Sequence, residues 1–174
     1  MRGIVRAAAL LLLAAACAAP APRDARTEKL DRLFEGLAAA RSEPEARRIE
    51  ASIQELWLNS GKAEIDAALA QAITEARDYN FETALAILDD LVKNHPLHAE
   101  AWNQRAAVRF FSGDLEGSFS DTDKVLALEP RHFGALAGRA LILLQMGDRP
   151  RAMENLRRAV AIDPYLRERD LLGD

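Results

Sequence analysis

The sequence predicts an all-α chain built as a stack of repeated helix pairs. Pro96, Pro130 and Pro164 lie 34 residues apart. The same period aligns small residues in three sets: Ala67, Ala101 and Ala135; Ala72, Ala106 and Ala140; and Ala84, Ser118 and Ala152. Apolar residues between them recur at helical rather than strand spacing. Small residues allow two helices to approach closely, and a fixed period of this length is typical of helical solenoids.

Residues 1–17 have the pattern of an export signal. Arg2 and Arg6 precede an apolar run from 7 to 16, which is too short to span a bilayer as a stable helix. The run ends in Leu-Ala-Ala-Ala-Cys, which resembles the cleavage motif of bacterial lipoproteins, and Cys17 would then become the lipidated first residue. Ordinary signal cleavage after Ala18 is the alternative and would remove Cys17. Both predict export to the periplasm, the first with a lipid anchor.

Residues 18–26 contain an Ala-Pro-Ala-Pro stretch and are expected to form a short extended tether. Residues 27–61 then form a predicted helical pair. Ser42 and Glu45 have capping-box spacing at the start of the second helix, and each helix has one apolar stripe. We expect this pair to cap the first repeat, because some thirty residues are too few to form an independent recognition module.

The repeats occupy residues 65–166 in three units, 65–98, 99–132 and 133–166. Gly113 and Gly147 are expected to end the first helix of their units. Asp114 and Asp148, with Asn80 in the first unit, are expected to cap the second helix. A proline closes each unit, because the residue before proline disfavours the helical conformation. Residues 167–174 form a short tail.

Units two and three resemble the tetratricopeptide repeat. The matching positions are Trp102, Ala106, Gly113, Asp114, Val125 and Pro130 in unit two, and Ala140, Gly147, Asp148, Ala152, Leu156, Ala159 and Pro164 in unit three. The first unit departs from the pattern, with Ala68 in place of the tryptophan and Tyr79 in place of the glycine. The resemblance implies a right-handed α-α superhelix of three hairpins whose first helices line a concave groove.

Groove residues follow from that register. They are Leu69, Ile73, Asn103, Ala107, Phe110, Ala137, Leu141 and Leu144. Because this set is largely apolar, it favours an amphipathic helix or an extended hydrophobic segment as the partner. The alternative is that the chain's own N-terminal helices fill the groove.

Arg105 and Arg139 stand where the family commonly has leucine. They are expected either to bind a carboxylate such as a peptide C-terminus or to form structural ion pairs with Asp121 and Asp123. The structural interpretation is favoured, because half-buried guanidinium groups need such partners.

Composition argues against several functions. The formal charge is -4 and becomes -6 without Arg2 and Arg6, so nucleic acid is an unexpected partner. His95 and His98 flank a repeat boundary and lack further ligands for a metal. No nucleophile turn or phosphate loop is present, so neither an enzyme nor a cofactor is predicted.

The predicted function is a non-enzymatic scaffold of the cell envelope that binds a partner segment in the groove. The alternative is an assembly or chaperone-like factor for exported proteins. Unit one has a formal charge of -4, unit two of -2 and unit three of +2. Unit three is the only basic unit and is expected to leave Met153, Leu156 and Val160 uncovered. We therefore expect that end to contact an acidic surface, either of a partner or, in weak self-association, of the first unit of another copy.

Overall fold

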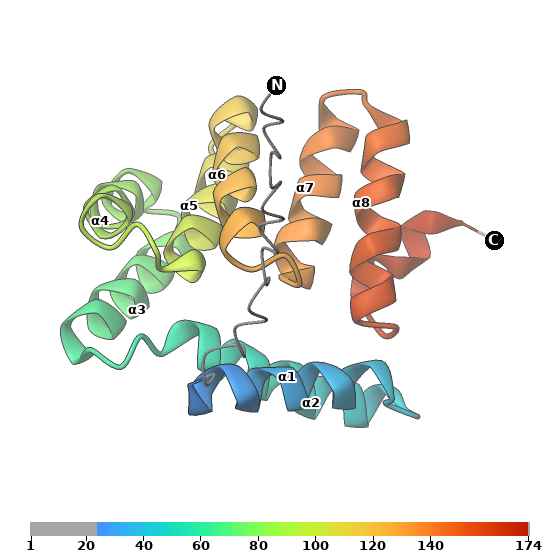
Figure 1. Cartoon of the computed structure of the whole chain (residues 1–174). Coiled ribbons are helices and arrows are strands. Elements are labelled where there is room, and N and C mark those ends of the chain that lie inside the picture. The colour runs from blue at the N-terminus through green and yellow to red at the C-terminus, as the bar shows by residue number, and fades with distance from the viewer. Residues whose placement is uncertain (1–23, 174) are drawn as a thin grey trace, which may run out of the picture.

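The structure is a computed structural model that describes residues 24–173. Within that range nearly every residue lies in a helix or in a short turn between helices. The helices are α1 (Ala25–Ala38), α2 (Glu43–Leu58), α3 (Ala63–Arg77), α4 (Phe81–Asn94), α5 (Ala99–Phe111), α6 (Leu115–Leu128), α7 (Phe133–Gln145), α8 (Arg149–Ile162) and the 3-10 helix η1 (Arg167–Leu172). Figure 1 shows the hairpins α3–α4, α5–α6 and α7–α8 in succession, with the α1–α2 pair running crosswise to them.

The turns inside the second and third hairpins form as their sequences predict. Gly113 and Gly147 have φ angles of 89° and 83°, a conformation that glycine adopts without steric cost. The carboxylates of Asp114 and Asp148 then accept hydrogen bonds from the N–H groups of Gly117 and Arg151, at 2.9 and 3.1 Å. These bonds satisfy backbone donors that a helix start leaves free.

Two predicted caps are wrong in detail. Asn80 makes no capping bond with its side chain, and its amide donates instead to Glu75 at 3.0 Å. Ser42 also makes no capping bond, whereas Glu45 accepts from the N–H of Arg41 at 3.0 Å. The helices still begin where expected, because Pro44 and the apolar stripes favour those boundaries independently of the caps.

Two apolar clusters hold the repeats together. One joins α3, α4 and α5 around the fully buried Ala72, Ala84 and Leu88. The other joins α7 and α8 around Ala140, Ala152 and Leu156. The aligned alanines are therefore close helix contacts, where a larger side chain would have no room.

The N-terminal pair packs on the last repeat, which corrects the expectation that it caps the first. Phe34, Leu37 and Ile53 belong to the same apolar cluster as α7 and α8. Two polar contacts accompany this packing: the guanidinium of Arg131 lies 2.7 Å from the carboxylate of Asp31 and 4.3 Å above the ring of Phe34. An amphipathic stripe specifies which face of a helix is buried, but not the surface that buries it.

The far end of the solenoid is consequently covered, contrary to prediction. Met153 is 8% exposed and Leu156 is 0% exposed, and Val160 is half-buried. These side chains pack in one cluster with residues of α1, α2 and the segment around η1. The N-terminal pair thus provides the cap that a repeat array needs at its last unit.

The predicted export signal, with Cys17, and the first part of the tether lie outside the described residues. Among residues 24–173, no helix combines the length and the apolar character needed to cross a bilayer.

Candidate functional site: a groove between the N-terminal pair and the repeats

A groove with a volume of about 620 Å³ lies between α2 and the first helices of the repeats. We call it the central groove. Its walls come from α2, α3 and α5, and it is closed at one end by the start of α7. Trp57, Ile73, Ala107 and Val108 provide apolar wall, and Asn103 and Gln104 bring side-chain amides to it. This mixture of apolar surface and a few polar groups is typical of sites that bind a ligand or a peptide.

A buried polar network forms the closed end of the groove. The Nδ1 atom of His132 accepts a hydrogen bond from the N–H of Ala135 at 3.0 Å, and so caps α7. Its Nε2 atom therefore carries the proton and donates to the carboxylate of Glu100, also at 3.0 Å. His132 is 2% exposed and Glu100 6% exposed. The pair is thus a structural connection between α5 and α7.

Glu100 is ionised in this setting. Burial is the largest effect on the pKa of its carboxyl and raises it. Hydrogen bonds from His132, Gln104 and Asn103 act together in the opposite direction, and the pKa of Glu100 lies below its usual value. The carboxylate is thus held by three side chains and has little capacity left to bind a partner.

Aromatic side chains surround the mouth of the groove. Tyr79 and Phe111 line it and are 81% and 71% exposed, and Phe81 lies beside Tyr79 with ring centroids 5.9 Å apart. Tyr79 has a φ angle of 62° at the position that is glycine in the other two repeats. A bulky residue in this conformation is strained, and such strain is concentrated at functional sites.

The structure separates the predicted groove residues into three groups. Ile73, Asn103 and Ala107 line the central groove. Leu69 is 1% exposed and lies in the floor of a neighbouring hollow between α2 and α3. The other four lie elsewhere. Ala137 and Leu141 line a hollow between α2, α7 and η1. Leu144 packs against the apolar cluster under the N-terminal pair, and Phe110 packs edge-on against Phe111.

The N-terminal pair explains this separation. It covers the side of α7 that an open superhelix would present to a partner, and it leaves the corresponding sides of α3 and α5 accessible. The chain's own helices therefore occupy part of the groove side of the last repeat, where the hollow lined by Ala137 and Leu141 remains, whereas the first two repeats keep an open groove.

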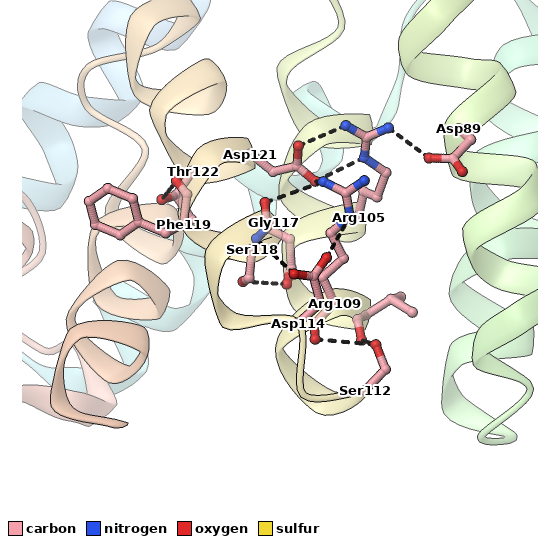
Figure 2. A network of polar contacts seen from close by, with 12 residues as sticks. Asp89, Arg105, Arg109, Ser112, Asp114, Gly117, Ser118, Phe119, Asp121 and Thr122 are labelled. Carbon is pink, nitrogen blue, oxygen red and sulfur yellow. Dashed lines mark hydrogen bonds and ion pairs between the residues drawn. The ribbon is translucent and has the colours of Figure 1, made fainter. Parts of the chain in front are cut away.

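The arginines at the family's leucine positions form structural ion pairs. Arg105 donates two hydrogen bonds to Asp121, at 2.7 and 2.8 Å, and a third to Asp89 at 2.7 Å. Arg109 also donates to the Oδ2 atom of Asp121, at 3.0 Å, as Figure 2 shows. Arg139 lies 2.6 Å from Asp123. Their guanidinium groups are engaged within the fold, which confirms the structural interpretation.

A second buried acid group fixes the N-terminal pair to the end of α8. Glu50 and Asp163 are 7% and 0% exposed, and Arg47 donates both to Glu50 at 2.9 Å and to the carbonyl of Tyr165 at 3.1 Å. Burial raises the pKa of Asp163 from 3.8 to about 6, and the neighbouring Glu50 acts in the same direction. This joint is therefore sensitive to pH.

Sequence reasoning missed Trp57, Glu100 and His132 as groove residues. One signal was present for His132, since His98 precedes it by 34 residues and both stand directly before a first helix. Trp57 carried no such signal, because its position in the groove depends on where the N-terminal pair packs. Within residues 24–173, no group of three or more His, Cys, Asp or Glu side chains is arranged to hold a metal ion.

Comparisons with known proteins agree on the fold. A TPR repeat-containing protein of Rhizobium etli is 38% identical over 121 residues, which are 70% of this chain. The chain spans 59% of the length of that relative. No protein-family model matches the chain.

Solved structures show the same architecture at lower identity. The first TPR of Spaghetti (RPAP3), bound to an HSP90 peptide, has a TM-score of 0.60 and 15% identity over 62% of this chain and 86% of its own. The yeast Sti1 TPR2AB domain, in a complex with HSP90, has a TM-score of 0.59 and 17% identity, and the match covers 84% of this chain and 61% of the Sti1 chain. MamA has a TM-score of 0.55 and 18% identity, and the match covers 82% of this chain and 77% of the MamA chain.

The chain therefore has the tetratricopeptide-repeat fold. The Rhizobium etli relative supports the same repeat family at the level of sequence.

Proposed function

We propose that this protein is a non-enzymatic scaffold that binds a segment of a partner protein in the central groove. The observation that carries this proposal is the exposed aromatic mouth. Tyr79 and Phe111 are large aromatic side chains that line the central groove and that the fold leaves exposed to water. Large exposed aromatic groups at a concave site are typical of binding surfaces.

Two further facts support it. Tyr79 keeps a strained backbone where glycine would be unstrained, so its side chain has a role that the turn itself does not require. The Spaghetti and Sti1 structures are TPR domains in complex with an HSP90 peptide or with HSP90, and this supports a partner protein as the ligand of the same architecture.

Site-specific photocrosslinking tests the proposal. A photoreactive phenylalanine analogue at position 111 is expected to crosslink a discrete partner in cells, and Tyr79→Ser is expected to reduce that product. The matched control is the same analogue at position 146, where Met146 is exposed in the α7–α8 turn and does not line the groove. Equal products from both positions, or none from position 111, would contradict the proposal. A ladder of many products would favour the chaperone-like alternative.

The protein acts in the cell envelope in this proposal. The basic start, the apolar run and Cys17 support export and lipid anchoring. Cys17 is the chain's only cysteine, so residues 24–173 can form no disulfide, even in an oxidising compartment. Cys17→Ser is expected to abolish acyl labelling and to release the protein from membranes. Membrane association that persists in this variant would contradict the anchor.

A further inference from the structure

The first repeat ends in a surface on which, within residues 24–173, no helix stacks. We call it the first-repeat end face. It contains a hollow of about 270 Å³ between α3 and α4, whose lining includes Ile65, Ala68, Ile87 and Leu91. In a solenoid such a face normally packs against a preceding repeat or a polar cap. Here the N-terminal pair packs on α7 and α8 instead, so no helix among the described residues covers this face.

The end face combines this apolar hollow with negative charge. Glu64 and Asp90 line the hollow and are both exposed. Leu97, two residues after the lining residue His95 in the turn that follows α4, is 82% exposed. A partner for this face needs positive charge around a small apolar contact.

The outer surface of α8 has those properties. Arg157, Arg158 and Ala161 are all exposed, and their spacing of three and four residues places them on one face of the helix. Neither arginine forms an ion pair within the described residues, in contrast to the half-buried arginines of α5. Over its length α8 carries four arginines against Glu154 alone.

We propose that the first-repeat end face of one copy binds the outer surface of α8 in a second copy. The two surfaces have opposite charge and belong to the same chain. They also lie at opposite ends of the molecule, where Figure 1 shows α4 and α8. A contact between two different surfaces of identical copies is heterologous, and it adds copies head to tail rather than closing a two-fold dimer. The contact involves exposed charges, so it weakens as salt screens them.

Paired charge reversals test this arrangement by sedimentation of the full-length chain carrying Cys17→Ser. The acid-reversed variant is Glu64→Arg with Asp90→Arg, and the base-reversed variant is Arg157→Glu with Arg158→Glu. The unreversed protein is expected to associate at about 10 mM salt and to dissociate at about 1 M, between which the Debye length falls from about 30 Å to about 3 Å. Each reversed variant alone is expected to sediment as a monomer at low salt.

The decisive measurement is the mixture of the two reversed variants. The positive end face of one then meets the negative α8 of the other, so association is expected to return. The matched control reverses Glu35 and Arg48, which are exposed on α1 and α2, and is expected to associate like the unreversed protein. A monomer at low salt and high protein concentration would overturn the proposal. So would association that persists in both reversed variants, or a mixture that stays monomeric.

Discussion

The indole ring of Trp57 stacks on the imidazole ring of His132, with centroids 3.9 Å apart and planes inclined by 10°. Trp57 belongs to α2, whereas His132 caps α7 and binds Glu100 at the start of α5. One contact therefore connects the N-terminal pair to two successive repeats and closes the central groove at that end.

Replacing Trp57 with alanine is expected to destabilise the fold strongly. The variant loses the stack on His132 and the ring contacts with Phe34 and Phe133. Truncating a buried tryptophan costs about 3–5 kcal/mol of unfolding free energy, which urea denaturation measures. The control is Leu58→Ala, because Leu58 follows Trp57 on α2 but is 38% exposed. Equal losses in the two variants would contradict the role of the stack.

Asp163→Asn is expected to stabilise the protein at neutral and alkaline pH. Burial raises the folded-state pKa of Asp163 to about 6, so ionising this carboxyl in the folded protein costs free energy. The group therefore lowers the stability of the fold as the pH rises from about 4 to about 6. Asparagine keeps the oxygen that accepts from the N–H of Tyr165. The gain at pH 8 is at most about 3 kcal/mol, because one pKa unit corresponds to about 1.4 kcal/mol.

Denaturation at several pH values checks this expectation. The difference between Asp163→Asn and the unsubstituted protein should disappear below about pH 3, where the carboxyl is protonated in both the folded and the unfolded chain. Asp170→Asn is the control, since its side chain is 89% exposed and should change stability little at any pH. A gain that is independent of pH would contradict the assignment to ionisation.

The turn residues predict opposite effects of two substitutions. Gly113 has a φ angle of 89° with open space around its missing side chain, so Gly113→Ala is expected to cost about 1–2 kcal/mol through the backbone alone. Tyr79→Gly relieves a φ angle of 62° and is expected to preserve or raise the melting temperature. The same variant should lose the groove crosslink. A stability loss in Tyr79→Gly would mean that its ring contributes more to the fold than its backbone strain costs.

Asp121→Asn is expected to be among the most destabilising polar substitutions. Asp121 is 1% exposed and neutralises both Arg105 and Arg109. Removing one partner from a buried ion pair costs about 3–5 kcal/mol, because the remaining charge is left uncompensated. Asp89 is the exposed partner of Arg105, and the Asp89 side chain is 56% accessible. Asp89→Asn should therefore cost about 0–1 kcal/mol of unfolding free energy. Similar losses in thermal unfolding would contradict this ranking.

The repeats were predictable because their signals are local. Pro130, Gly113 and Asp114 each act on the backbone within a few residues, so a recurring set of them defines where helices begin and end. The pairing of Arg105 with Asp121 was predictable for a similar reason, since both residues lie in the same hairpin, whereas its second partner, Asp89, lies in the preceding hairpin and was not predicted.

The central groove was only partly predictable, because its second wall depends on a contact between distant segments. The repeat register identified Ile73, Asn103 and Ala107, which lie on helices of the array itself. It also proposed Ala137, which α2 covers. The apolar stripe of α2 specifies which face of the helix is buried, but it does not specify which repeat buries that face.

The packing of the first helices on the last repeat sets a delay during synthesis. Asp31 and Arg131 are 100 residues apart in sequence, and Arg47 and Tyr165 are 118 residues apart. At about 5–20 residues per second, α1 and α2 leave the ribosome roughly 5–20 s before the helices that bury them. During that interval Phe34, Ile53 and Trp57 lack the side chains of α7 and α8 that bury them in the folded protein. A nascent chain of this protein therefore exposes its N-terminal apolar side chains longest, and a C-terminal truncation would leave them exposed permanently.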